Sequence, residues 1–319
     1  ADAAGNLLKY TINKTMMRVE LPTTLKPGQQ FIFNIDWSYK ISDRTKYGGR
    51  GGYEYFPDDG NYLFSIEEKE QFLQKEPRAQ KYFKRWFGAD EFINGWERAC
   101  MWLGEESLDN LKNIPLIWER VENVKSFRQK SKSAPTIKLA QIPNRFHVEN
   151  MPTGNYLLIP RVSSERRIYI PIGFITPDIL SSDSVHLIPN ADLFLFGVLV
   201  SKMHMAWVRY VAGRLKSDYR YSKDIVYNNF PFPKNVEKAE TKNIEAAAQA
   251  VLDARKKHAP ASLATLYDPL KMPADLLAAH KALDKAVDLA YGIKREFATE
   301  AKRVAWLFEQ YAILTGNGA

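Results

Sequence analysis

The side chains best suited to chemistry lie between Ser201 and Pro233, where the sequence reads SKMHMAWVRYVAGRLKSDYRYSKDIVYNNFPFP. Lysine and arginine outnumber aspartate in this run, and tyrosine, tryptophan and phenylalanine are interleaved with them. Because cations attract phosphates and aromatic rings stack on bases, the run is typical of a surface that binds nucleic acid. Its charge alone would suit any polyanion.

Motifs for cofactor binding, metal binding and nucleophilic catalysis are missing from the sequence. The glycine cluster GGRGG at 48–52 lacks the Gly-Lys-Ser/Thr of a phosphate-binding loop. The histidines form no HExxH pair, no G-x-S-x-G elbow occurs, and the single cysteine, Cys100, reads as a small buried hydrophobe. We therefore expect no catalytic residue, no metal site and no bound cofactor in this chain.

Length and composition indicate a folded protein with an anionic partner. The chain has 319 residues, 45% of them hydrophobic, and a net charge of +8, with a pI near 9.2. These values favour two or three packed domains and a partner such as nucleic acid. No apolar window approaches the roughly 18 residues of a membrane-spanning helix, so we expect a cytoplasmic protein without a membrane partner. The start at Ala1 without methionine suggests a fragment or a processed product.

The predicted fold class is α+β, in three parts. Residues 1–60 read as β structure because apolar residues alternate in FIFNIDWSYKI at 31–41. Residues 61–235 mix short strands and helices, and residues 236–319 form alanine-rich helices that end near Gly292 and Gly316.

The middle part carries the local signals on which this prediction depends. Ser65 and Glu68 form a capping box that predicts a helix start. Single helices are predicted over 107–131 and 190–213. The predicted strands are ACMWL at 99–103, NYLLIPRV at 155–162, RRIYIPIGFI at 166–175 and VHLIP at 185–189.

From about Gly60 onward, several phrases together resemble the MmeI-like enzymes. They are DDGNYLF, KYFKRWFGADEFINGWERACMWL, IPRVSSERRIYIPIGF, the Ser201 to Pro233 run and SLATLYDPLKMPADLLAAHKALDKAVDLAYG. In these bacterial restriction-modification proteins an adenine-specific DNA methyltransferase domain precedes a target recognition domain and a helical C-terminal domain. The resemblance implies that residues 61–235 are the recognition domain and residues 236–319 the helical domain. Their implied partners are duplex DNA and the parent's methyltransferase domain.

The resemblance also implies what this chain lacks. The family's catalytic NPPY-type motif and its cofactor-binding glycines are not in the sequence, so S-adenosylmethionine is expected in the parent enzyme only. Residues 1–60 depart from the family pattern and resemble the N-terminal β domain of gluzincin aminopeptidases without their HExxH motif. We therefore expect a join of two unrelated fragments near residues 57–64.

Cations around the run divide into phosphate-binding and base-reading candidates. Arginine and lysine side chains spaced through a helix end and a loop are assigned mainly to phosphates, against the alternative of a solvated basic face. These residues are Arg209, Arg214, Arg220 and Lys223. Arg166 and Arg167 are weaker phosphate candidates, because one of the two would point inward if their segment were a strand.

Lys216 and Asp218 are the base-reading candidates, because the resemblance places a base-pair-reading pair at these two positions of G-R-L-x-S-x-Y. An extended backbone would put both side chains on one face. Lysine can donate to guanine and aspartate can accept from cytosine, so the pair is predicted to read one G·C base pair, worth about 1 to 3 kcal/mol against the wrong base. The alternative is a surface salt bridge.

Tyr219 and Tyr221, with Tyr227 and Phe230, are candidates for stacking on a displaced base. The alternative, that these rings belong to the core, has more weight. Two other functions of the whole chain stay open: a helical protein-interaction module, or an inactive fragment of a zinc aminopeptidase.

Overall fold

The computed structural model describes residues 6–13, 16–26, 28–33, 58–147, 149 and 151–316. The chain divides into two units, Ala1–Tyr55 and Phe56–Ala319. In the first unit, β1 (Tyr10–Asn13) and β2 (Met16–Val19) pair antiparallel. Most of the strand predicted at 31–41, and the whole of the glycine cluster at 48–52, lie outside the described residues.

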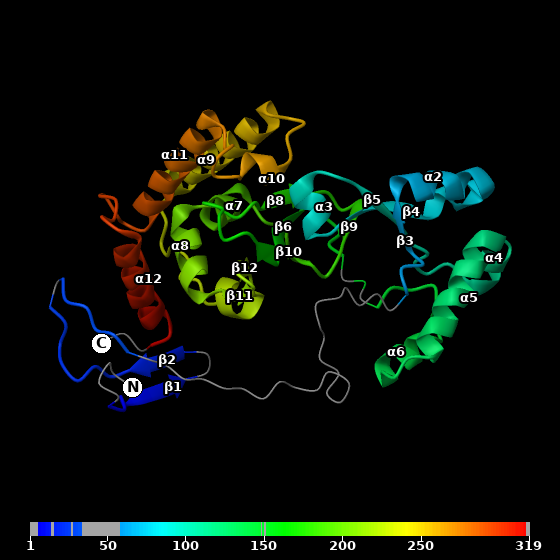
Figure 1. Cartoon of the computed structure of the whole chain (residues 1–319). Coiled ribbons are helices and arrows are strands. Elements are labelled where there is room, and N and C mark those ends of the chain that lie inside the picture. The colour runs from blue at the N-terminus through cyan, green and yellow to red at the C-terminus, as the bar shows by residue number, and fades with distance from the viewer. Residues whose placement is uncertain are drawn as a thin grey trace. The chain divides into compact units, whose positions relative to one another are not determined.

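The second unit is α+β, as predicted, and opens with a four-stranded sheet in the order β3–β5–β4–β9 (Figure 1). The sheet is antiparallel except that β9 runs parallel to β4. The predicted strand at ACMWL is confirmed as β5. The bounds are β3 (Leu63–Ser65), β4 (Phe83–Phe87), β5 (Arg98–Met101) and β9 (Ile179–Ser181).

The predicted capping box at Ser65 is confirmed at the start of α2 (Ile66–Lys75). The Glu68 N–H donates to Ser65 Oγ at 3.1 Å, and the Ser65 N–H donates to Glu68 Oε2 at 2.7 Å. The 3₁₀ helix η1 (Pro77–Tyr82) and the short helix α3 (Ala89–Asn94) frame strand β4.

The single helix predicted over 107–131 is wrong, because the segment forms α4 (Leu108–Lys112) and α5 (Pro115–Gln129). Pro115 disfavours helical backbone at Ile114 and starts a new helix at its own position. The buried side chains Leu111, Ile117 and Val121 then pack into one core with β3 and β5. A short helix, α6 (Ala134–Leu139), follows α5.

Two three-stranded antiparallel sheets follow, in the orders β10–β6–β8 and β11–β12–β7. The strands predicted at 155–162 and 185–189 are confirmed, but the one at 166–175 is strand only at its end. Residues 166–172 instead contact the helical tail, because the Tyr169 hydroxyl donates to Asp284 and the Ile172 carbonyl accepts from Arg255. The bounds are β6 (Tyr156–Pro160), β7 (Val162–Ser163), β8 (Gly173–Ile175), β10 (Val185–Pro189), β11 (Gly213–Leu215) and β12 (Asp218–Arg220).

The helix predicted over 190–213 is also two helices, α7 (Leu193–Leu199) and α8 (Lys202–Val211). Ser201 separates the two helices, because it is the N-cap of α8 and its Oγ accepts the His204 N–H at 3.3 Å. A π-helical turn, η2 (Lys223–Tyr227), follows β12.

The helical tail is confirmed, with positive φ at Gly292 (+77°) and Gly316 (+74°) where α11 and α12 end. Its helices are α9 (Lys238–Lys257), α10 (Leu263–Leu266), α11 (Ala274–Ala290) and α12 (Glu300–Leu314). Helix α7 approaches α9 so closely that a Cβ at Gly197 would lie 2.7 Å from Ile244 Cγ2. No helix among the described residues is long and apolar enough to cross a bilayer.

The tail shares one core with the preceding sheets, and buried polar contacts cross the boundary. Asp284 of α11 accepts the Tyr169 hydroxyl at 2.7 Å and the Lys202 N–H at 2.6 Å. Arg255 of α9 donates to the Ile172 carbonyl at 2.6 Å. Because unpaired buried polar groups are costly, these contacts fix how the tail docks.

The buried carboxyl of Asp284 predicts a measurable pH dependence of stability. Burial raises its pKa to about 6, although the bonds from Lys202 and Tyr169 lower it in part. In the unfolded chain the Asp284 carboxyl has a pKa of about 4. Between about pH 4 and pH 6 the folded protein therefore keeps a proton on Asp284 that the unfolded chain has already lost. The stability from this group is present below pH ~4 and is lost as the pH rises through about 6.

Asp284→Asn removes this titration. The free energy of unfolding of the variant, relative to the unmodified chain, should rise by about 2 kcal/mol between pH 4 and pH 7. Urea unfolding at both pH values measures the difference, with Asp253→Asn, at an exposed position on α9, as the control. A difference that stays constant with pH would contradict the predicted titration.

Candidate nucleic-acid interface

A short hairpin, β11–β12, forms the exposed end of the Ser201 to Pro233 run. Arg214 pairs with Tyr219 and Leu215 with Asp218, so Lys216 and Ser217 make a two-residue turn. On its other side β12 pairs with β7, which anchors one strand of the hairpin in a sheet. Residues 213–217 are all exposed, and 48% of Leu215 is accessible. The hairpin therefore presents its tip to solvent.

The structure does not support the extended backbone from which we predicted that Lys216 and Asp218 share a face. Lys216 has φ +57°, which lies in the left-handed region that residues other than glycine rarely adopt. Asp218 is half-buried, and its Oδ1 accepts the Glu165 N–H at 3.2 Å. The described residues offer the Lys216 ammonium no hydrogen-bond or ion-pair partner. The tip thus carries one fixed acceptor and one free cation.

Two predicted phosphate ligands, Arg214 and Arg220, lie on the hairpin itself. The Arg214 guanidinium lies 4.0 Å from the centre of the Tyr219 ring and donates to the Ser217 carbonyl at 3.1 Å. Its orientation is therefore fixed while its side chain stays exposed. Arg220 is exposed and has no hydrogen-bond or ion-pair partner within the described ranges.

Arg209 and Lys223 are already paired with carboxylates. Arg209 forms an ion pair with Glu300 of α12 and donates to the Ile168 carbonyl at 3.2 Å, so it ties α8 to the tail. The Lys223 ammonium lies 2.5 Å from Asp224, with both side chains about two-thirds exposed. A phosphate would have to compete with these carboxylates.

Arg166 and Arg167 lie in a turn between β7 and β8, so the strand considered for them is wrong. Arg166 is exposed, whereas Arg167 is half-buried and donates to Ser163 Oγ at 3.3 Å. Burial lowers the pKa of Arg167, while the charges of Asp218 and Asp268 act in the opposite direction. Only Arg166 of the two is oriented toward solvent.

The rings of Tyr219 and Tyr221 are buried, with exposed fractions of 5% and 2%. Tyr221 Oη lies 2.9 Å from His204 Nε2, and burial lowers the pKa of His204 to about 3. The contact is therefore between neutral groups. Phe230 is also buried and Tyr227 is half-buried. To stack on a base these rings would have to leave the core.

Arg161 and His186 were not predicted, yet they lie beside this surface. Arg161 donates its N–H to the Ser184 carbonyl at 3.0 Å and accepts the Tyr221 N–H at 2.8 Å. Its Nε is buried without a hydrogen-bond partner among the described residues. Burial lowers the pKa of His186, and the charges of Arg161 and Lys223 add to this effect. An arginine directly after the fully buried strand YLLIP is the signal that could have identified this cation.

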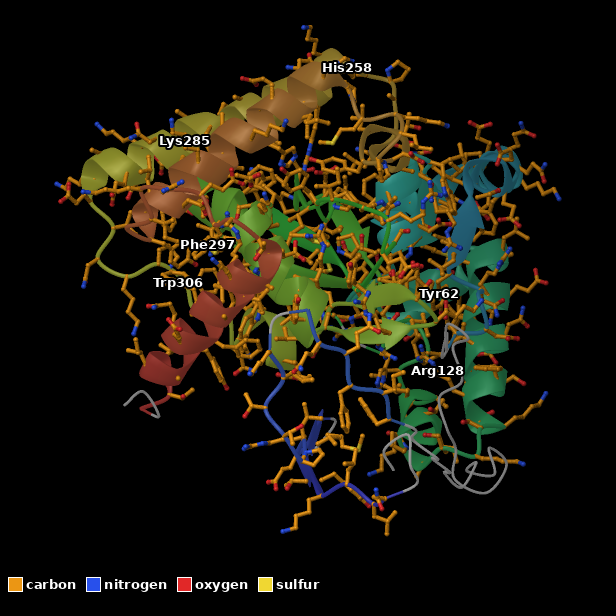
Figure 2. The ribbon with its side chains drawn as sticks, turned by 60° about the vertical axis from the view of Figure 1, so that its left-hand side comes forward. Tyr62, Arg128, His258, Lys285, Phe297 and Trp306 are labelled. Atoms are coloured by element: carbon orange, nitrogen blue, oxygen red, sulfur yellow. The ribbon has the colours of Figure 1, made fainter. Side chains whose placement is uncertain are left out.

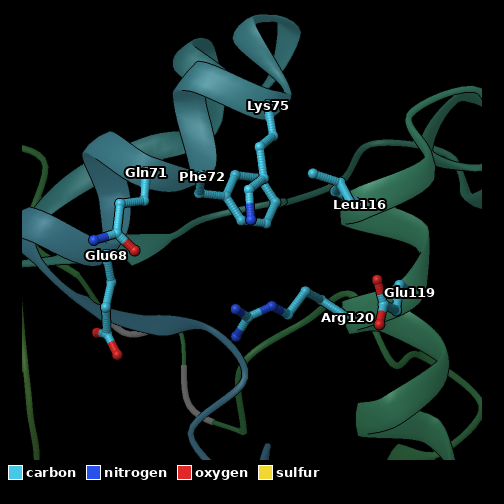
Figure 3. Close-up of a pocket in the computed structure, with 7 residues that line it drawn as sticks. All are labelled: Glu68, Gln71, Phe72, Lys75, Leu116, Glu119 and Arg120. Carbon is cyan, nitrogen blue, oxygen red and sulfur yellow. The ribbon is translucent and has the colours of Figure 1, made fainter.

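A pocket between α2 and α5 lies elsewhere in the second unit (Figure 3). One of its lining residues is Arg120, whose guanidinium lies over the Phe64 ring at 4.7 Å and donates to the Asn61 carbonyl at 3.1 Å. This arginine is engaged in packing, and two carboxylates line the same pocket. The lining residues are Glu68, Gln71, Phe72, Lys75, Leu116, Glu119 and Arg120. The hairpin is thus the better candidate for binding an anion.

Comparison with known proteins gives matches over nearly all of the second unit. The protein-family model of the MmeI target recognition domain matches residues 52–234, and that of the MmeI C-terminal domain matches residues 236–317. DNA methyltransferase A of Bacillus subtilis (strain 168) is 40% identical over 258 residues, which are 81% of this chain and 29% of that protein.

A solved structure of the type IIL restriction-modification enzyme MmeI in complex with DNA is also similar. It aligns with a TM-score of 0.79 and 46% identity over 82% of this chain and 34% of that chain. The present chain therefore spans about a third of the length of both relatives.

The left-handed backbone at the hairpin tip predicts how substitutions of Lys216 change stability. Lys216→Gly should keep or raise the free energy of unfolding, by up to about 1 kcal/mol, because glycine adopts positive φ without a steric cost. Lys216→Val should lower it by about 1 kcal/mol, since a branched Cβ fits this region poorly. Urea unfolding of both variants measures the difference, and equal stability of the two would argue against the turn.

Proposed function

The chain belongs to the family of MmeI target recognition domains, and we propose that it is the part of a DNA methyltransferase or restriction-modification protein that reads duplex DNA sequence. One observation carries the proposal: a hairpin anchored in a sheet presents Lys216, Arg214 and Arg220 to solvent. A two-stranded β ribbon fits the major groove, where each base pair has a distinct pattern of donors and acceptors.

In this role the tip reads bases and the flanking cations position the hairpin. Lys216 donates to a guanine, and Asp218, held by the Glu165 N–H, accepts from the paired cytosine. Arg220, Arg214 and Arg166 contact phosphates, because they are exposed and not paired with a carboxylate in the described residues. Arg209 would have to exchange Glu300 for a phosphate, and Lys223 would have to exchange Asp224, before either could contact DNA. Arg167, which is half-buried, is the weakest of the six phosphate-binding candidates.

The parent protein supplies the chemistry in this proposal. Its methyltransferase domain, using S-adenosylmethionine, would modify an adenine near the base pairs that this chain reads. Such an enzyme acts in the bacterial cytoplasm. Tyr219 and Tyr221 stay predictions as stacking residues, and their burial favours a role in supporting the hairpin from beneath.

Binding of duplex DNA by this chain should weaken steeply with salt, because phosphate contacts release counterions. Arg220→Gln should lower the slope of log K against log salt by about 1, to a similar extent on every DNA sequence. Fluorescence anisotropy from 50 to 200 mM salt measures it. Arg295→Gln, which also removes an exposed arginine, is the matched control. An unchanged slope, or an altered base preference, would rule out a phosphate contact for Arg220.

Exchanging the two base-reading charges should change the preferred sequence at one base pair. We expect Lys216→Glu with Asp218→Arg to lose the preference for G·C at that position, at a cost of about 1 to 3 kcal/mol on the original sequence. Selection from a randomised duplex pool reads the preference at every position. The control exchanges the exposed ion pair of α4, Asp109→Lys with Lys112→Asp. If the double variant at the tip selects the same sequence, the pair does not read bases.

A further inference from the structure

A second basic surface lies at the corner between α5 and α6, well separated along the chain from the hairpin. Residues 123–144 contain five lysines and arginines and no aspartate or glutamate. Lys130, Lys132 and Lys138 are exposed. Across the ranges that the structure describes, none of these three ammonium groups has a hydrogen bond or an ion pair. We name these three residues the lysine corner.

The segment that follows the lysine corner, residues 139–145, is held from inside by buried side chains. Arg128 is fully buried, and its guanidinium donates to the carbonyls of Leu139, Ile142 and Arg145 at 3.1, 3.0 and 2.7 Å. Tyr62 adds a bond from its hydroxyl to the Pro143 carbonyl at 2.7 Å. A buried arginine thus fixes the segment after α6, while the lysines around it stay free.

The hairpin and the lysine corner lie on the same side of the second unit relative to the α9–α11 pair. In Figures 1 and 2, α6 and the hairpin lie below these two helices. Figure 2 shows Lys285 of α11 at the upper left and Arg128 of α5 at the lower right. Lys285 of α11 is therefore apart from Arg128, which lies at the end of α5.

Given the DNA-binding role proposed above, on which this contact depends, we infer that the lysine corner binds backbone phosphates of the same duplex, outside the base pairs that the hairpin reads. A lysine ammonium on a flexible stem is a point charge that suits phosphates without reading sequence. Gln129, Ser133 and Gln141, which are also exposed at this corner, supply neutral donors to the same oxygens. Duplex DNA suits this surface because its phosphates form a dense line of negative charge, and three exposed cations that neutralise phosphates release counterions.

The test compares two triple variants of the whole chain. Lys130→Gln, Lys132→Gln and Lys138→Gln remove the lysine corner. Lys242→Gln, Lys256→Gln and Lys285→Gln remove three other exposed lysines, from α9 and α11, so the net charge of both variants is the same. The probe is duplex DNA, titrated by fluorescence anisotropy from 50 to 200 mM salt.

The lysine-corner variant should lose about 2 to 3 from the slope of log K against log salt, if each lysine neutralises one phosphate. It should bind every sequence more weakly and keep its base preference. The α9–α11 variant should change the slope by less than 1. Equal slopes for the two variants would overturn the lysine-corner contact while leaving the hairpin's role intact, whereas no salt-dependent binding by the unmodified chain would overturn the proposed function itself.

A second measurement uses the unmodified chain, so it does not depend on any variant folding. Acetylation of lysines, read by mass spectrometry, should slow at Lys130, Lys132 and Lys138 when duplex DNA is added. It should stay unchanged at Lys242, Lys256 and Lys285. Protection at the hairpin without protection at the lysine corner would overturn the contact between the lysine corner and DNA.

Discussion

The position of the β11–β12 hairpin depends on one buried junction, where α8, before the hairpin, and η2, after it, are held together. Trp207 of α8 is buried and donates its indole N–H to the Val226 carbonyl of η2 at 3.0 Å. Tyr221, directly after β12, meets His204 of α8 through its hydroxyl. Because both ends are fixed in a close-packed core, an exposed tip with few contacts of its own still has a defined place.

The same core decides which cations are free to meet an anionic partner. Arg209 pairs with Glu300, and Arg303 binds Asp288 with one bond at 2.8 Å, so these arginines hold α8, α11 and α12 together. A paired cation gains little by exchanging one anion for another, since the first contact must be given up. The net charge of +8 therefore says less about binding of an anion than the places where exposed cations have no carboxylate partner among the described residues, such as the hairpin and the lysine corner.

Local signals in the sequence predicted those parts of the fold that depend on neighbouring residues. The Ser65 capping box, the strands β5, β6 and β10, and the glycine ends of α11 and α12 are of this kind. The strand at 166–175 failed because Tyr169 and Ile172 bond to residues over 80 positions away. The extended backbone expected at Lys216 was wrong for a similar reason: lysine has no preference for φ +57°, so the turn at Lys216 follows from the pairing of β11 with β12. Arg161 was missed because Ser184 and Tyr221, which fix its backbone, are distant in sequence.

The boundary between recognition domain and helical tail is a boundary in sequence rather than in packing. The two family matches meet between residues 234 and 236, yet Phe196 of α7 lies in one core with Ile244 of α9 and Leu283 of α11. The close approach at Gly197 leaves no room for a side chain between α7 and α9. Asp284 also accepts the N–H of Lys202 at the first turn of α8. Since α8 leads directly into β11, the tail is part of the support of the hairpin, and its docking helps set the position of the exposed tip.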